Sequence, residues 1–265
     1  MRIIRFEIYR AFHSHTFLLS ILIGFIICAL DLISFCIMFG VNGAKQMYLI
    51  QSWIGTDYQF AYNQMFYIFL PVIACLPYGG SQFTDIRSGY DKNILTKVSR
   101  TDYTIAKCIA VFLSAFVGVV FPLGLNLFVS AGLFPDYIPE RLEWMSVGLL
   151  DRNLFVELTY THPVFYCLVY ILIDGFFAGA IALTSISIAR GVKSFFTAVV
   201  TPAVILLVMS IFLEGNEYGN WSVSEMLNPV QNVVTLWWQM FIAFVFILVL
   251  NVIVSLITTR KRDVL

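Results

Sequence analysis

The hydrophobic positions of this chain are gathered in long segments, separated by short polar stretches. Six segments are long enough to cross a hydrocarbon core about 30 Å thick, which takes about 20 helical residues. No strand-like alternation extends along the chain, which argues against a transmembrane β-barrel. The pattern predicts an all-α polytopic membrane protein with one transmembrane domain, residues 1–265. The six predicted spans are Phe17–Phe39, Tyr62–Tyr78, Ile105–Leu133, Val164–Ala189, Phe195–Leu213 and Val233–Ile257.

Basic residues are distributed unevenly between the two ends of these spans. If both termini lie on one side, only Lys45, Arg141 and Arg152 lie on the other. Because loops rich in Lys and Arg stay in the cytoplasm, both termini are expected there, with the chain in a bacterial cytoplasmic membrane. The first apolar segment is too long for a signal peptide and lacks a small-residue cleavage site, so it is expected to remain as a span.

Composition agrees with a lipid environment and excludes several other classes of protein. Hydrophobic residues make up 60% of the chain and charged residues 12%, with a mean hydropathy of +0.85. A soluble domain carries about twice that charged fraction. The net charge is zero, so no nucleic-acid partner is expected. The five cysteines lie in apolar segments without a C-x-x-C pair, which predicts neither a disulfide framework nor a metal site.

Two amphipathic stretches lie outside the spans, on the predicted cytoplasmic side. In residues 1–15 apolar residues recur every four positions, which predicts a helix lying in the membrane interface rather than a plain charged anchor. In residues 81–104 the same spacing predicts a short helix with one apolar stripe and a charged surround. Such a helix is suited to docking on a partner, whereas the alternative is a solvated loop whose charges only set the topology. The stripe consists of Ile86, Tyr90, Ile94 and Val98.

Two segments lie on the opposite side, residues 134–162 and 214–232. Both combine acidic residues with aromatic residues and proline, and aromatic side chains favour the headgroup level of a membrane. Each segment is too short for an independent domain. They are expected to form short helices that cap the outer face.

Two acidic residues, Asp31 and Asp174, fall within predicted spans. An intramembrane carboxylate is a functional candidate because burying it is costly. Asp31 is expected near the outer third of its span, where water reaches it. Asp174 is deeper and is followed by small residues at helical spacing, which predict close packing against another helix. Those residues are Gly175, Ala178, Gly179 and Ala182.

Motifs for intrinsic catalysis are absent from the sequence. The phosphate-binding pattern GxxxxGK[ST], the zinc-protease pattern H-E-x-x-H and the hydrolase pattern G-x-S-x-G do not occur. His13 and His15 are two positions apart, so one helix would not place them on the same face. The chain is therefore expected to be no enzyme on its own and to bind no cofactor.

The loop between the second and third predicted spans carries a recognisable sequence. It contains the run Asp85–Tyr90, the run Ser99–Tyr103 and Lys107, and a further run, Leu227–Pro229, precedes the last span. Together with the topology, these runs resemble the permeases of ABC-2 type transporters, which are transmembrane subunits of ABC exporters. The resemblance extends over essentially the whole chain.

The resemblance implies a type V exporter-like architecture and a set of partners. Such permeases pair as homodimers or heterodimers, each with a separate ATP-binding subunit that holds ATP and Mg²⁺. They export amphiphilic cargo, here expected to be a peptide or a hydrophobic drug. Docking of the ATP-binding subunit is expected at the interfacial helix and the 81–104 loop. The docking candidates are Asp85, Arg87, Gly89, Tyr90, Ile94, Val98 and Arg100.

Three other functions remain open from the sequence. An ion-coupled secondary transporter would show inverted repeats and several buried charges, whereas only two acidic residues lie within the spans. An intramembrane enzyme would need clustered catalytic residues. A membrane immunity protein that sequesters a peptide is harder to separate from an exporter, because many exporters also confer immunity.

Overall fold

The computed structural model describes residues 2–40, 48–57, 61–135 and 153–260, and every regular element in these ranges is helical. Five helices are long and apolar enough to cross a membrane, which indicates a multi-pass membrane protein. They are α2 (His15–Phe39), α7 (Arg100–Leu133), α9 (Pro163–Ile188), α10 (Phe195–Glu214) and α12 (Trp237–Arg260). The all-α prediction is confirmed, and five of the six predicted spans correspond to these helices.

The remaining predicted span, Tyr62–Tyr78, is shorter than expected. Its helix, α4, runs from Ala61 to Cys75, which is 15 residues. At 1.5 Å per residue it is about 22 Å long, less than the hydrocarbon thickness of about 30 Å. The helix ends before Pro77, and a proline disfavours helical conformation in the residue before it. The chain then continues in turns to Gly80.

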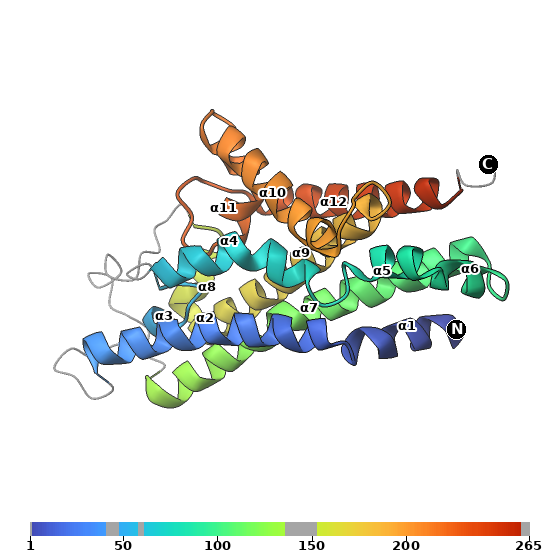
Figure 1. The fold of residues 1–265 in the computed structure, drawn as a ribbon. Helices are drawn as coiled ribbons and strands as arrows, with labels where there is room; N and C mark the ends of the chain where they lie inside the picture. Colours follow the sequence, from blue (N-terminus) through green and yellow to red (C-terminus); the bar gives the residue numbers. More distant parts are fainter. Residues whose placement is uncertain (1, 41–47, 58–60, 136–152, 261–265) are drawn as a thin grey trace.

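Shorter helices lie at the two ends of the bundle (Figure 1). One end, called the α5 end, carries α1 (Arg2–Phe12), α5 (Ser81–Ser88) and α6 (Tyr90–Leu95), together with the last turns of α12. The opposite end, called the α11 end, carries the remaining short elements. These are α3 (Leu49–Ser52), α8 (Val156–Thr161), η2 (Gly219–Trp221) and α11 (Val223–Leu227). The first and last described helices therefore reach the same end, as the sequence predicts.

The 81–104 loop forms two short helices rather than the single one predicted. Gly89 separates α5 from α6 and has a φ of 73°, in the left-handed region that glycine adopts without strain. The helical spacing of Ile86, Tyr90 and Ile94 is therefore interrupted, and Val98 follows the end of α6. The predicted continuous apolar stripe does not exist as one helix face.

Helices α7 and α9 make the most extensive helix contact and form the centre of the bundle. The predicted small-residue face of α9 lies in this contact, where Gly175 faces Val120 and Phe116, and Gly179 faces Phe112. Ala178 and Ala182 on the same helix are fully buried. The prediction of close helix packing at these residues is confirmed.

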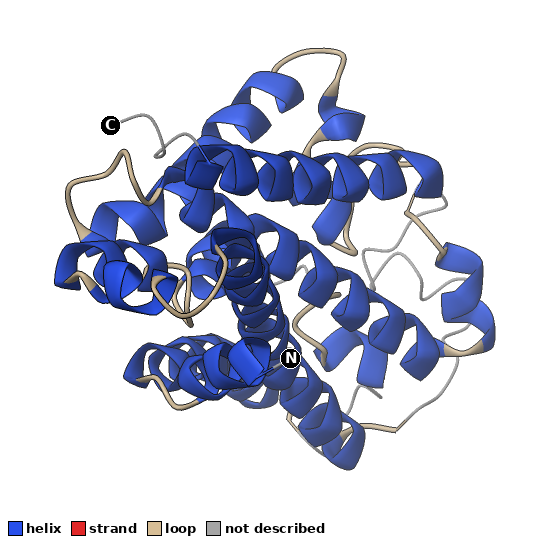
Figure 2. Ribbon diagram, turned by 90° about the vertical axis from the view of Figure 1, so that its right-hand side faces the viewer, coloured by secondary structure: helices blue, strands red, loops and turns tan. Residues whose placement is uncertain are grey.

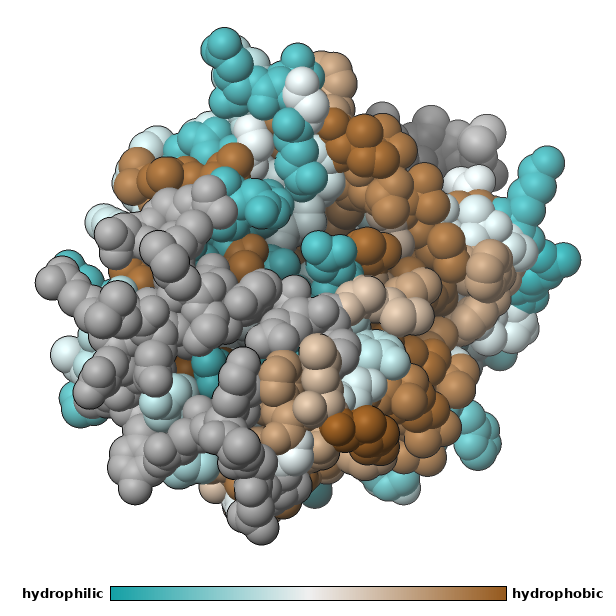
Figure 3. All heavy atoms as spheres, turned by 90° about the vertical axis from the view of Figure 1, so that its left-hand side faces the viewer, coloured by the Kyte–Doolittle hydropathy of each residue, from teal (hydrophilic) through white to brown (hydrophobic). Residues whose placement is uncertain are grey.

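Large apolar side chains cover the outward faces of the long helices. Ile37 of α2 is 81% exposed and Phe128 of α7 is 77% exposed. In the view of the α11 end, hydrophobic residues gather along one flank of the molecule (Figure 3). Water does not favour such extensive apolar patches, whereas lipid does. These faces are consistent with contact with lipid in a multi-pass membrane protein.

The two predicted outer segments are described in part. Residues 136–152 of the first segment lie outside the described residues, and its last part contains α8. The second segment contains η2 and α11, which agrees with the expected short helices. A further short helix, α3, was not predicted, and the residues that follow it, Trp53 and Ile54, are completely buried.

Candidate functional site

Four charged side chains meet at the α5 end, and we call them the ionic cluster: Glu7, Arg10, Asp85 and Lys107. Arg10 Nη1 lies 3.0 Å from Glu7 Oε1, and Arg10 Nη2 lies 2.9 Å from Asp85 Oδ1. Lys107 Nζ lies 3.1 Å from Glu7 Oε2 and also pairs with Asp85. Glu7 and Lys107 are fully buried, and Asp85 is nearly so. The cluster joins α1, α5 and α7, which are far apart in the sequence (Figure 2 views this end).

Three tyrosines complete the surroundings of the ionic cluster. The Tyr78 hydroxyl donates to Glu7 Oε2 at 2.8 Å, and the Tyr103 hydroxyl donates to Asp85 Oδ2 at 2.8 Å. The Lys107 ammonium lies 4.6 Å from the Tyr78 ring centroid, and the Arg10 guanidinium lies 4.5 Å from that of Tyr90. Cations over aromatic faces are attracted by the ring quadrupole. Both carboxylates therefore accept hydrogen bonds, and both cations face rings.

Two acidic and two basic groups make the ionic cluster neutral overall. Burial by itself would raise the pKa of Asp85, but the nearby Lys107 and Arg10 outweigh it and hold that pKa below its ordinary value. A carboxyl with a lowered pKa stabilises the fold above its ordinary pKa of about 4, and the contribution is lost as the pH falls through the lowered value. At neutral pH the pairing of Asp85 is therefore complete.

The predicted docking residues separate into a buried and a surface group. Asp85 points inward to the ionic cluster, and Gly89 forms the turn between α5 and α6. Arg87 is exposed, and its Nη1 donates to the Lys193 carbonyl at 3.0 Å. The other four residues are half-buried: Tyr90, Ile94, Val98 and Arg100. Of the predicted docking residues, these four and Arg87 have side chains at the surface of the α5 end.

The sequence analysis missed Glu7 and did not foresee that Arg10 would be a partner of Asp85. The buried face of α1 contains Glu7 and Ala11, which are both fully buried. Ile4 and Ile8, which belong to the apolar residues that recur every four positions in residues 1–15, are only half-buried. One signal was available, because Glu7 is the only acidic residue among three arginines in this helix. Its spacing of three residues from Arg10 predicts an ion pair on one face of the helix, and this pair is present in the structure.

The two intramembrane acids have different surroundings. Asp174 of α9 is fully buried, and its Oδ2 accepts a hydrogen bond from the Tyr67 hydroxyl at 3.2 Å. Asp31 of α2 is also fully buried, so the expectation that water reaches it is wrong. Neither oxygen of Asp31 has a hydrogen-bond partner among the described residues. Asp31 is buried because it lies on the face of α2 that also buries Cys28 and Phe35.

Replacing Asp31 with asparagine should stabilise the chain. The side chain keeps its shape but loses a carboxyl whose oxygens have no hydrogen-bond partner among the described residues, and burying an ionised group costs more than burying an amide. The expected gain is about 1–3 kcal/mol in the free energy of unfolding, measured by reversible unfolding in mixed detergent micelles. Glu217→Gln, a change at an exposed acid, serves as the control and should have little effect. A loss of stability in Asp31→Asn would show that Asp31 is paired in the folded protein.

These features indicate a helical multi-pass membrane protein in which a buried ionic cluster joins α1 to α7, the longest of the described helices. Comparisons of the chain with protein-family models, with curated proteins and with solved structures found no match.

Proposed function

We propose that this chain is the transmembrane permease subunit of an ATP-driven ABC exporter. It moves amphiphilic cargo, a peptide or a hydrophobic drug, out of a bacterial cell, and ATP with Mg²⁺ is held by a separate ATP-binding subunit. A second permease, identical or related, completes the transporter. The proposal is supported most by the ionic cluster, because it links the docking candidates on α5 and α6 directly to two other helices.

The link provides a mechanical path from the surface to the bundle. A subunit that moves α6 would also move α5, because the two helices are joined by a single glycine. Asp85 on α5 holds Arg10 of α1 and Lys107 of α7. Helix α7 then packs along α9 through the glycine contacts of the bundle centre. Motion at the α5 end would thus reach the spans as movement of near-rigid helices.

The docking surface is best tested with Ile94, because its side chain is half-buried at the end of α6 and makes no ionic contact. Tyr90 is less suitable, since it lies against Arg10 of the ionic cluster. In Ile94→Asp, a charge replaces an apolar contact, and we expect at least about a tenfold loss of the ATP-binding subunit that co-purifies with the chain. Transport-linked ATP turnover should fall in parallel.

The control adds the same charge at the other end of the molecule. Asn216→Asp changes an exposed residue just after α10 and should leave the ATP-binding subunit bound. Both variants must elute as folded chains in gel filtration. If no ATP-binding subunit co-purifies with the wild type, or Ile94→Asp retains it fully, the exporter proposal fails.

One observation favours a second function, an ion-coupled secondary transporter. Asp31 and Asp174 are fully buried carboxylates on two long helices, and such groups carry protons in many transporters. Transport driven by a proton gradient in vesicles without any ATP-binding subunit, and abolished in Asp174→Asn, would support this function over the exporter.

A further inference from the structure

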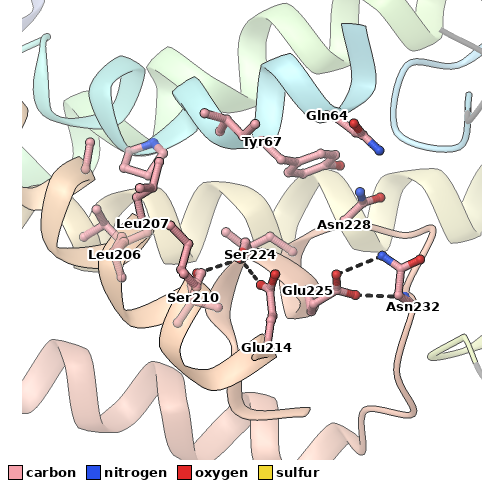
Figure 4. Close-up of a pocket in the computed structure, with 17 residues that line it drawn as sticks. Gln64, Tyr67, Leu206, Leu207, Ser210, Glu214, Ser224, Glu225, Asn228 and Asn232 are labelled. Carbon is pink, nitrogen blue, oxygen red and sulfur yellow. Dashed lines mark hydrogen bonds between the residues drawn. The ribbon is translucent and has the colours of Figure 1, made fainter. Parts of the chain in front are cut away.

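A cavity of about 460 Å³ opens between α4, α10 and α11, and Ile181 of α9 also lines it. This volume is within the range of about 300–1,000 Å³ that is typical of small-molecule sites. Figure 4 shows Leu206 and Leu207 at one end of the cavity and polar side chains toward the other. The polar end includes Glu214 at the end of α10, which places it at the α11 end of the molecule. The cavity is therefore amphiphilic along its length.

The apolar part of the cavity lies at the depth of the spans. Leu206, Leu207 and Ala203 come from the middle of α10, and Ile68 with Pro71 comes from α4. These side chains can cover a hydrocarbon chain without presenting a charge. Tyr67 lines the cavity with its aromatic ring, and its hydroxyl donates a hydrogen bond to Asp174.

The polar part of the cavity is acidic. Glu214 and Glu225 line it, and no Lys, Arg or His is among the described lining residues. Glu214 Oε1 accepts from the Ser222 hydroxyl at 2.6 Å and from the Ser224 hydroxyl at 2.9 Å. Glu225 accepts from the backbone N–H and the side-chain amide of Asn232, at 2.8 and 3.0 Å. Neutral donors thus hold both carboxylates in place, and their negative charge is not compensated within the lining.

We propose that this cavity binds amphiphiles with a cationic head, such as an alkylammonium. The hydrocarbon tail lies along Leu206, Leu207 and Ile68, and the ammonium group lies between Glu214 and Glu225. An anionic amphiphile with the same tail is repelled by the two carboxylates, and a neutral one gains only the apolar contact. That such a molecule is the cargo rests on the proposed function, but the binding site does not.

The test is binding of radiolabelled dodecyltrimethylammonium to the full chain in nonionic micelles, with no ATP-binding subunit present. In the double variant Glu214→Gln with Glu225→Gln, both side chains keep their shape but lose their charge. The glutamine at 214 keeps the one oxygen that accepts from Ser222 and Ser224, whereas the glutamine at 225 keeps one of the two oxygens that accept from Asn232. We expect affinity to fall at least about tenfold, as for a lost charge-assisted contact. Leu207→Trp should also abolish binding, because the indole fills the apolar part of the cavity.

Two controls distinguish binding of the probe in the cavity from its general attraction to an acidic surface. Glu217→Gln removes an exposed acid that does not line the cavity, so it should leave the affinity unchanged. Dodecyl sulfate, with the same tail and opposite charge, should not compete with the probe. Equal affinity of the wild type and the double Gln variant, or competition by dodecyl sulfate, would overturn the proposal.

The ammonium group can come from a membrane lipid or from a soluble amphiphile, and competition distinguishes the two sources. Displacement of the probe by phosphatidylethanolamine supports a lipid occupant of this site, whereas its failure to compete supports a soluble cation. Because binding is measured on the chain alone, a negative result leaves the docking of an ATP-binding subunit untouched. Loss of docking in Ile94→Asp would likewise leave this cavity unaffected.

Discussion

Replacing Lys107 with methionine should lower the free energy of unfolding by about 3–5 kcal/mol, as expected when one partner of a buried ion pair is removed. Lys107 is fully buried and holds both carboxylates of the ionic cluster. Without it, Glu7 and Asp85 share Arg10 alone, and one buried negative charge is left uncompensated. Methionine fills a similar volume, so little of the loss comes from a cavity. Reversible unfolding in mixed detergent micelles, followed by tryptophan fluorescence at neutral pH, measures the change.

A second substitution separates the charge effect from other consequences of Lys107→Met. Adding Glu7→Gln removes one anion together with the cation, so the remaining pair, Arg10 and Asp85, is neutral. The double variant should be more stable than the sum of the two single losses predicts, by about 0.5–3 kcal/mol. Lys92→Met, at an exposed position of α6, is the control and should change stability by less than about 0.5 kcal/mol. A near-neutral effect of Lys107→Met would contradict the importance of the ionic cluster.

Replacing Gly175 with alanine should also destabilise the chain, by about 1–3 kcal/mol, because it overpacks the contact between α7 and α9. A Cβ at Gly175 would collide with Val120 and lie 2.9 Å from two ring atoms of Phe116. Both neighbours belong to α7. The collision is therefore removed only if α7 and α9 separate or the Phe116 ring and Val120 move. The same unfolding measurement detects the loss, and Gly175→Val should increase it.

Gly124 provides a matched control on the other helix of the same pair. A Cβ there would have no heavy atom within 4 Å, so no collision occurs. Alanine favours a helix interior by about 1 kcal/mol relative to glycine. Gly124→Ala should therefore leave stability unchanged or raise it slightly, whereas Gly175→Ala lowers it. Equal effects at both positions would show that helix propensity, and not the close approach of the helices, determines the outcome.

The two predictions concern the two contacts through which the proposed exporter would transmit motion. The ionic cluster connects α5 to α1 and α7, and the glycine contacts connect α7 to α9. A variant that loosens either contact while keeping the chain folded should weaken the relation between ATP turnover and transport. Ile94→Asp acts earlier, at the surface where the ATP-binding subunit is proposed to dock.

The sequence by itself determined the helical class, the five long spans and the close-packed face of α9. Each of these is a local property, because an apolar run of sufficient length or small residues at helical spacing can be recognised within one segment. The helix at the N-terminus was recognisable for the same reason. The length of α4 was not, since Pro77 ends the helix although the apolar run continues to Tyr78.

Only the tertiary structure decided which charged residues meet. Glu7, Asp85 and Lys107 come from three helices. In the sequence Glu7 and Asp85 have charged neighbours that suggest a solvated or docking surface, whereas Lys107 lies in the apolar start of a predicted span, and nothing near it indicates its partners. Asp85 was predicted to face a partner, yet it turns inward, because two cations from α1 and α7 compensate its charge there. Likewise, Asp31 is buried by the packing of α2, and the acidic cavity forms only where α4, α10 and α11 converge. Burial and pairing depend on residues that are distant along the chain, and a pattern within one segment does not contain them.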